Sequence, residues 1–181
     1  MKAKRIVISG GPGSGKTTLI NHLEDQGHIC MPEISRDVIK QAQQEGIEQL
    51  FLTNPILFSK KLLEGRLQQF HKANKFEENK LFYDRGMPDV TAYMDYINAH
   101  YPANFTQTCN RYRYDAVFLL PPWEDIYVQD DERYESFEQA EIIYEFLLKG
   151  YQNYDYDVVE VPVGSITERT DYIIDKLKHL F

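Results

Sequence analysis

The chain has 181 residues, a length typical of a single domain with a sizeable hydrophobic core, and we treat 1–181 as one domain. Hydrophobic residues at 43% and charged residues at 27% are the balance of a water-soluble globular protein. The net charge of −8 argues against a nucleic-acid-binding protein, because nucleic-acid binding relies on an excess of lysine and arginine. No apolar run approaches the roughly 20 residues of a membrane-spanning helix, so we expect no membrane partner.

The cysteines and the N-terminal residues indicate where the protein works. Cys30 and Cys109 lack the spacing of a metal site and favour reduced thiols in the cytoplasm. The basic start is followed by only a short apolar run before the first glycine, which is not the pattern of a secretion signal. We therefore expect a cytoplasmic protein. The sequence favours no particular oligomeric state.

A glycine-rich stretch near the N-terminus carries the clearest functional signal. Residues 10–17 read G-x-x-x-x-G-K-T, after the apolar run of a buried strand and before apolar residues at helical spacing. Strand, glycine loop and helix in this order predict a loop whose backbone N–H groups surround the phosphates of a nucleoside triphosphate. Lys16 would contact the β- and γ-phosphates, and the Thr17 hydroxyl would ligate magnesium. An ordinary strand-to-helix turn with an incidental Gly-Lys-Thr is the alternative. The expected nucleotide contacts are Gly11, Pro12, Gly13, Ser14, Gly15, Lys16, Thr17 and Thr18.

Four further strands follow this first one, with helical patterns between them. They are expected at residues 28–33, 80–85, 114–120 and 156–162. Five apolar strands joined by helical crossovers predict an α/β fold with a parallel sheet covered by helices on both faces.

Two of the helices have recognisable first turns. The longest should begin after Asn54 as N-cap, with Pro55 at the first helical position. The last should begin with a capping box formed by Ser165 and Glu168. In the first helix, one face should carry Ile56, Leu63, Leu67 and Phe70, and the buried stripe of the second should consist of Ile173, Ile174, Leu177 and Leu180.

Acidic and basic residues follow the carboxyl ends of the second and third strands, which is where parallel sheets of this kind bind ligands. Glu33 ends the second strand with Arg36 three residues further on, and Asp84-Arg85 ends the third. An acid can orient magnesium or take a proton from an attacking hydroxyl, and arginines neutralise charge on a transferred phosphoryl group. The alternatives are a surface ion pair for Glu33 and Arg36, and a solvated turn acid for Asp84.

Five segments together resemble a known family. They read GGPGSGKTT (10–18), PEISRDVI (32–39), LFYDRGMPDVTAY (81–93), QDDERYESFEQA (129–140) and VPVGSITERTDYII (161–174). In this order, over nearly the whole chain, they resemble the bacterial predicted-ATPase group of AAA-type proteins, whose members are built like nucleotide and nucleoside kinases. The resemblance implies a P-loop NTPase fold with strand order 2-3-1-4-5, a magnesium–ATP site and a mobile lid.

The resemblance also implies roles for the charged strand ends. Asp84-Arg85 matches a pair in thymidylate and deoxynucleoside kinases, where the acid lies near magnesium and the arginine near the transferring phosphate. Glu33 matches the acid that serves as base in nucleoside kinases. Gly86 departs from the pattern, because those kinases usually have Ser or Tyr there, and this counts against a nucleoside acceptor.

The acidic segment 121–141 is the expected lid. In kinases of this build a lid arginine closes over the phosphates, excludes water and stabilises the transition state, and Arg133 is the candidate. A polar loop in which Arg133 pairs with its acidic neighbours is the alternative.

The remaining site assignments concern the base and the acceptor. By resemblance, Val163 and Gly164 would lie beside the adenine, and residues 34–76 would cover the acceptor. The expected acceptor contacts are Glu33, Arg36 and Arg85.

These features predict a small-molecule kinase that uses ATP and Mg²⁺. It would transfer the γ-phosphoryl group to an acceptor that the sequence does not identify. The alternative is an ATPase or nucleotide-dependent switch acting on a protein partner, and a non-catalytic nucleotide-binding module is a third reading. A length of 181 residues leaves little room for the extra helical domain of a motor ATPase. The expected catalytic residues are Lys16, Glu33, Asp84, Arg85 and Arg133.

Overall fold

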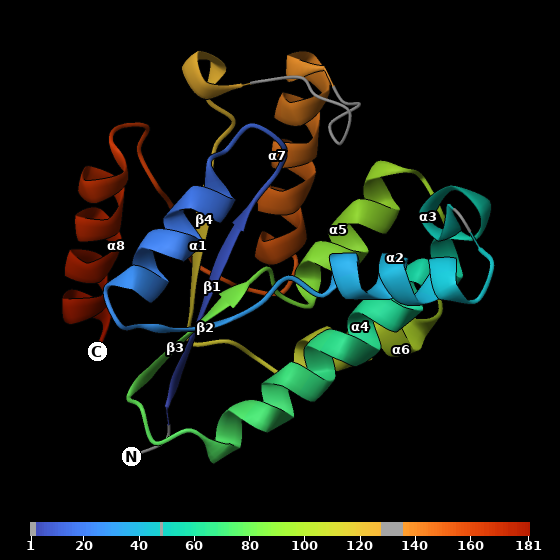
Figure 1. Ribbon diagram of the computed structural model, residues 1–181, viewed down its shortest axis with the longest axis horizontal. Helices are drawn as coiled ribbons and strands as arrows, with labels where there is room; N and C mark the ends of the chain where they lie inside the picture. The colour runs from blue at the N-terminus through green and yellow to red at the C-terminus, as the bar shows by residue number, and fades with distance from the viewer. Residues whose placement is uncertain (1–2, 48, 128–135) are drawn as a thin grey trace.

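Five parallel strands form a single sheet at the centre of the molecule (Figure 1). The protein is described from a computed structural model, which covers residues 3–47, 49–127 and 136–181. The strand order is β2-β3-β1-β4-β5, and neighbouring strands pair in parallel, as the sequence predicted. The strands are β1 (Lys4–Gly10), β2 (Ile29–Met31), β3 (Lys80–Asp84), β4 (Ala116–Leu120) and β5 (Val158–Glu160).

Helices cover both faces of this sheet. They are α1 (Lys16–Asp25), α2 (Ser35–Gln44), α3 (Leu50–Thr53), α4 (Pro55–Lys72), α5 (Pro88–Tyr96), α6 (Ala103–Arg111), α7 (Phe137–Gln152) and α8 (Ile166–Leu180), with short 3₁₀ turns η1 (Ala73–Lys75) and η2 (Glu124–Ile126). α1 and α8 pack on one face, and α2, α4, α5, α6 and α7 lie on the other. Among the described helices, none combines the length and apolar character needed to cross a bilayer.

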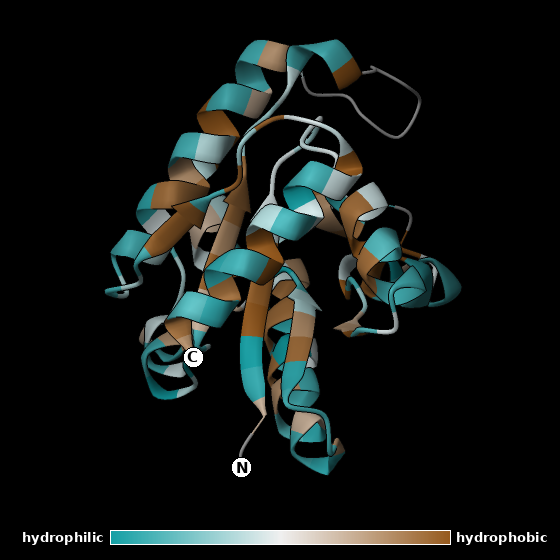
Figure 2. Cartoon of the chain, turned by 90° about the vertical axis from the view of Figure 1, so that its left-hand side faces the viewer, coloured by the Kyte–Doolittle hydropathy of each residue, from teal (hydrophilic) through white to brown (hydrophobic). Residues whose placement is uncertain are grey.

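The two faces of the sheet have separate hydrophobic cores, because side chains alternate along each strand. Ile6 and Ile8 of β1 pack with α1 and α8, whereas Val7 between them packs with the opposite layer. Figure 2 shows this burial as hydrophobic strands beneath helices whose outer sides are hydrophilic. Both sides of the sheet are therefore covered, as a parallel sheet requires.

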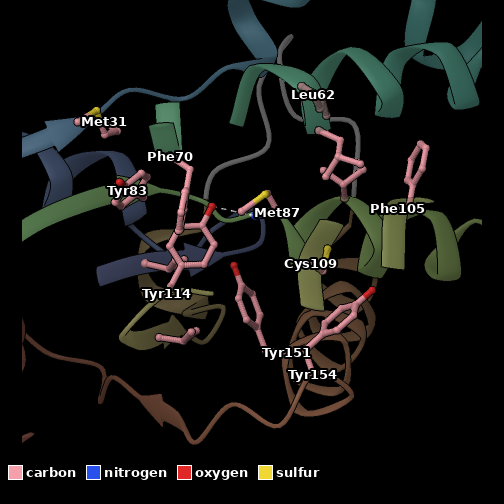
Figure 3. Close-up of a cluster of buried hydrophobic side chains, with 14 of the residues drawn as sticks. Met31, Leu62, Phe70, Tyr83, Met87, Phe105, Cys109, Tyr114, Tyr151 and Tyr154 are labelled. Atoms are coloured by element: carbon pink, nitrogen blue, oxygen red, sulfur yellow. Dashed lines mark hydrogen bonds between the residues drawn. The ribbon is translucent and has the colours of Figure 1, made fainter. Parts of the chain in front are cut away.

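The larger core is rich in tyrosine and lies on the side of α4, α5 and α7 (Figure 3). Tyr114 and Tyr151 are buried in it, and the Tyr114 hydroxyl accepts a hydrogen bond of 3.2 Å from the backbone N–H of Met87. Met87 follows β3 by three residues, so this aromatic core directly supports the chain that leaves the carboxyl end of β3.

The predicted helix starts are confirmed, but the predicted burial of Leu180 is wrong, and Ile56 is exposed as well. The Asn54 side chain accepts a hydrogen bond from the Leu57 N–H at 3.0 Å, and Ser165 and Glu168 form a capping box. Ile56 and Leu180 are 44% and 50% exposed, although both fit the helical spacing. Each lies in a terminal turn of its helix, beyond the margin of the core, where correct spacing alone does not bring a neighbour.

Close contact between α5 and α7 gives a test of the fold. A Cβ added at Gly150 of α7 would lie 2.6 Å from the Cβ of Ala92 in α5. We expect Gly150→Ala to lower the free energy of unfolding by about 1–3 kcal/mol, because overpacking outweighs the roughly 0.5–1 kcal/mol gained in helix propensity. Urea denaturation measures this change.

The control is Glu141→Ala, an exposed position of α7, which also places an alanine in this helix but adds no atom to the contact with α5. We expect this control to be close to the parent in stability. A Gly150→Ala variant as stable as the parent would show that the two helices are not in tight contact.

Candidate active site

The glycine-rich loop joins β1 to α1 and is fixed by its own backbone and by residues 121–127, the described first part of the proposed lid. Gly13 and Gly15 have φ angles of 70° and 73°, a left-handed conformation that favours glycine. A Cβ on Gly13 would overlap the Tyr127 ring, so glycine is needed there for space as well. The Trp123 N–H donates to the Gly13 carbonyl at 3.1 Å. The loop thus presents the strand–loop–helix geometry of a phosphate-binding loop.

Lys16 and Asp84 meet where this loop passes the end of β3. Lys16 begins α1, Asp84 ends β3, and their side chains form an ion pair in which each is only 9% exposed. Burial and then the nearby charge of Arg85 lower the pKa of Lys16, against the opposing effects of Asp84 and Glu33. Thr17, the next residue of the same turn, is exposed to solvent. The expected lysine and acid are therefore paired in the structure, and Thr17 follows Lys16 in the first turn of α1.

Glu33, after the end of β2, is held by two arginines. Its carboxylate accepts from Arg85 Nε at 2.6 Å and from Arg66 Nη2 at 3.2 Å, and its own exposure is 15%. The Ser35 N–H also donates to it, at 3.3 Å. Burial alone would raise the pKa of Glu33, but Arg85, then Arg66 and Lys16, outweigh burial and hold this pKa at about 2. Glu33 is thus a buried, ionised carboxylate, and the surface ion pair with Arg36 is not formed.

Arg85 adopts an uncommon backbone conformation that turns the chain sharply after β3. Its φ is 72°, and its N–H donates to the Ile8 carbonyl of β1 at 3.0 Å. The guanidinium reaches Glu33 on one side and Asp89 at 3.4 Å on the other. The two carboxylates raise the pKa of Arg85, although burial opposes this. A left-handed residue other than glycine is costly and persists where its surroundings fix it.

Asp89 and Arg66 are parts of this cluster that sequence reasoning missed. Asp89 accepts from the Ser9 hydroxyl at 2.6 Å, from the Gly86 N–H at 2.8 Å, and from the Tyr151 hydroxyl. Arg66 is 3% exposed and also donates to the Gly86 carbonyl, at 2.8 Å. An arginine inside the apolar stripe of α4 and an acid four residues after Arg85 were the available signals.

Gly86 departs from the kinase pattern for a packing reason. A Cβ at this position would lie 2.6 Å from the Tyr151 hydroxyl, 3.0 Å from the Tyr114 ring and 3.1 Å from a Val7 methyl. The aromatic core fills the space that a larger residue would need. The glycine therefore reflects the neighbouring tyrosines and carries no information about the acceptor.

Other predicted site residues lie outside this cluster. Arg36 is exposed in the first turn of α2 and forms no ion pair with another residue of the described segments. Val163, 52% exposed, and Gly164 lie in the loop between β5 and α8. Arg133 falls outside the described residues, as does part of the proposed lid at 121–141.

Solved structures with the same fold are kinases and related proteins. A deoxyadenosine kinase from M. mycoides, with products dCMP and a flexible dCDP bound, has 19% identity and a TM-score of 0.62, covering 97% of this chain and 99% of that one. The NadR protein in complex with NR has 15% identity and a TM-score of 0.71, covering 99% of this chain but 51% of its own. At these identities the similarity establishes the fold, which is that of P-loop nucleoside and nucleotide kinases.

Sequence comparison places the chain in a family. No curated protein is significantly similar to it. The model of the family described as AAA domain matches residues 5–169, which include the five strands except Lys4 at the start of β1, the glycine-rich loop and the charged cluster. The chain belongs to the AAA domain family.

Proposed function

We propose that the protein is a P-loop phosphotransferase that binds Mg-ATP on the glycine-rich loop and phosphorylates a small molecule held near Glu33 and Arg85. One observation carries this proposal. The Lys16–Asp84 and Glu33–Arg85 ion pairs lie side by side at the carboxyl ends of adjacent strands. The first pair suits a triphosphate with its metal ion, and the second suits a negatively charged phosphoryl group approaching an acceptor.

The residues present fit magnesium and ATP. Magnesium keeps most of its waters and binds through one or two protein oxygens plus phosphates. The exposed Thr17 hydroxyl and the Asp84 carboxylate supply that number of oxygens, and the described segments contain no cluster of three or more metal-binding side chains. Bound magnesium would neutralise phosphate charge. Lys16 would contact the β- and γ-phosphates, and Val163 and Gly164 would border the adenine.

Glu33 is better suited to orient an acceptor than to deprotonate it. A general base works best when its pKa lies near the operating pH, whereas the pKa of Glu33 is about 2. A carboxylate held by two arginines can still accept a hydrogen bond from a hydroxyl and keep Arg85 in place. Glu33 is therefore a positioning group in this proposal, and Arg85 is the residue that meets the transferring phosphoryl group.

The acceptor would lie under residues 34–76. Arg66, from α4 in this region, reaches Glu33, so the region touches the charged cluster. Gly86 is explained by packing and does not exclude a nucleoside. A solved relative is named deoxyadenosine kinase, so nucleosides are the first acceptors to test.

The decisive experiment measures ADP release with and without a metabolite library that includes nucleosides. We expect at least one metabolite to raise ADP release above background and to appear as its phosphorylated product. Lys16→Met should abolish this turnover, because the variant loses the lysine charge at the phosphates. It must be assayed below its own melting temperature, since it leaves the buried Asp84 unpaired. If no metabolite is phosphorylated and a partner protein stimulates hydrolysis, the protein is a nucleotide-dependent switch.

A magnesium titration tests Asp84 separately. Asp84→Asn should raise the magnesium concentration for half-maximal turnover and lower turnover at saturation, because an amide holds the metal and its waters less strongly than a carboxylate. Asp175→Asn makes the same charge change on the exposed face of α8 and should titrate like the parent. Asp84 has no part in metal binding if its variant also titrates like the parent.

The low pKa of Glu33 gives a pH-dependent stability. Its pKa falls from 4.5 to about 2 on folding, so its stabilising effect is full above pH 4.5 and is lost as the pH falls from there towards 2. Glu33→Gln should lower the free energy of unfolding by about 2–4 kcal/mol at pH 7, and this difference should shrink below about pH 4.5.

Urea denaturation between pH 7 and pH 3 measures this difference. Glu64→Gln is the control, since Glu64 pairs at 4.0 Å with Lys60 and both side chains are 58% exposed. Its effect should stay below about 0.5 kcal/mol at every pH. A pH-independent effect of Glu33→Gln would mean that the carboxylate has its ordinary pKa in the folded protein.

A further inference from the structure

Arg169 is a buried cation for which the described residues supply no hydrogen-bond partner at two of its three side-chain nitrogens. It lies near the start of α8 and is 1% exposed. By residue volume it is the largest of the fully buried side chains in the described residues. Its Nε and Nη2 atoms have no hydrogen-bond partner within the described segments. A buried unpaired polar group is expensive, and a buried unpaired charge more so, which calls for an explanation.

Other buried arginines show what Arg169 lacks. Arg66 and Arg85 share the Glu33 carboxylate, and Arg5 donates to the Asn74 side chain at 2.6 Å. Carboxylates raise the pKa values of Arg66 and Arg85 against the effect of burial. The pKa of Arg169 is lowered, and burial is its single cause. No acid among the described residues compensates the charge of Arg169.

The position of Arg169 indicates what could compensate that charge. A Cβ placed on Gly15 would lie 2.9 Å from Arg169 Nη1 and 3.0 Å from Ile126 Cδ1. Gly15 is the left-handed residue that caps α1, and its backbone belongs to the phosphate-binding turn. α1 and α8 pack against each other, so the guanidinium is held against this turn.

We propose that Arg169 is the fixed counter-charge for the phosphates of the bound nucleotide, acting through Gly15 as a positioning residue. This inference rests on the proposed nucleotide binding. The triphosphate would bring negative charge to the same turn that the Arg169 guanidinium lies against. Because Arg169 is poorly solvated, its guanidinium would attract the phosphates even without direct contact. This attraction would add to that of the positive N-terminal end of the α1 dipole.

This role predicts opposite effects on stability and on binding. Arg169→Met has similar length and no charge, so without ligand the variant should melt at the same temperature as the parent or higher, because an unpaired buried charge is removed. Its affinity for AMP-PNP with magnesium should fall about tenfold or more, as expected when a charged partner of the phosphates is lost. If Arg169 only packed the core, Arg169→Met would lower the melting temperature and leave the affinity for AMP-PNP unchanged.

Calorimetry with three probes separates phosphate from base recognition. Arg169→Met should bind AMP-PNP and inorganic tripolyphosphate more weakly than the parent, and adenosine equally well. Arg169→Lys keeps the charge and should retain most of the affinity. Arg111→Met, an exposed arginine in α6, makes the same change in net charge and should bind like the parent.

Several results would overturn the inference. Arg169→Met with parental affinity for both phosphate probes, or with clearly reduced stability or failure to fold, would make Arg169 a packing residue. A loss confined to adenosine would make it a base contact. If the parent itself binds neither AMP-PNP nor tripolyphosphate, the proposed function fails together with this inference, whereas normal binding by both parent and Arg169→Met defeats only the role of Arg169.

Discussion

The parallel pairing of β1 with β3 is the constraint on which the candidate site depends. In this register Ile8 lies opposite Asp84, so the glycine-rich loop leaves β1 beside the acid that ends β3. The bond from the Arg85 N–H to the Ile8 carbonyl continues the ladder by one residue and fixes the left-handed turn after it. A shift of one residue would turn Asp84 to the other face of the sheet. The Lys16–Asp84 pair is thus a direct consequence of strand register.

The charged side chains at this edge of the sheet are buried. Each is paired with an opposite charge, and this pairing makes their burial tolerable. Lys16 pairs with Asp84, while Arg85 lies between Glu33 and Asp89. Removing one partner of a buried ion pair typically costs about 3–5 kcal/mol, because the other charge is left uncompensated in a poorly solvated environment. Such pairs are weak sources of net stability, so their concentration at one edge of the sheet favours a functional over a structural origin.

Features that depend on residues close together in the sequence could be predicted from it. The glycine-rich loop and the capping residues are of this kind, and so are the apolar strands. The order of the strands in the sheet came from the family resemblance. Arg66 and Asp89 could not be placed, because their partners lie 33 and 80 residues away in Glu33 and Ser9. Arg169 was not singled out either, because its burial depends on the packing of α8 beside α1 and the glycine-rich loop.

Two parts of the chain that lie far apart in the sequence meet the cluster through separate contacts. α4 reaches it by the Arg66–Glu33 pair, and α7 reaches it by the Tyr151 hydroxyl on Asp89. Arg85 bonds to both carboxylates, so its guanidinium links the region proposed to cover the acceptor with α7, the helix in which the proposed lid ends. A kinase needs its acceptor and its phosphates held in a common geometry at the moment of transfer. If the protein acts as the proposed kinase, the single Arg85 side chain at the end of β3 would hold the two regions in that common geometry.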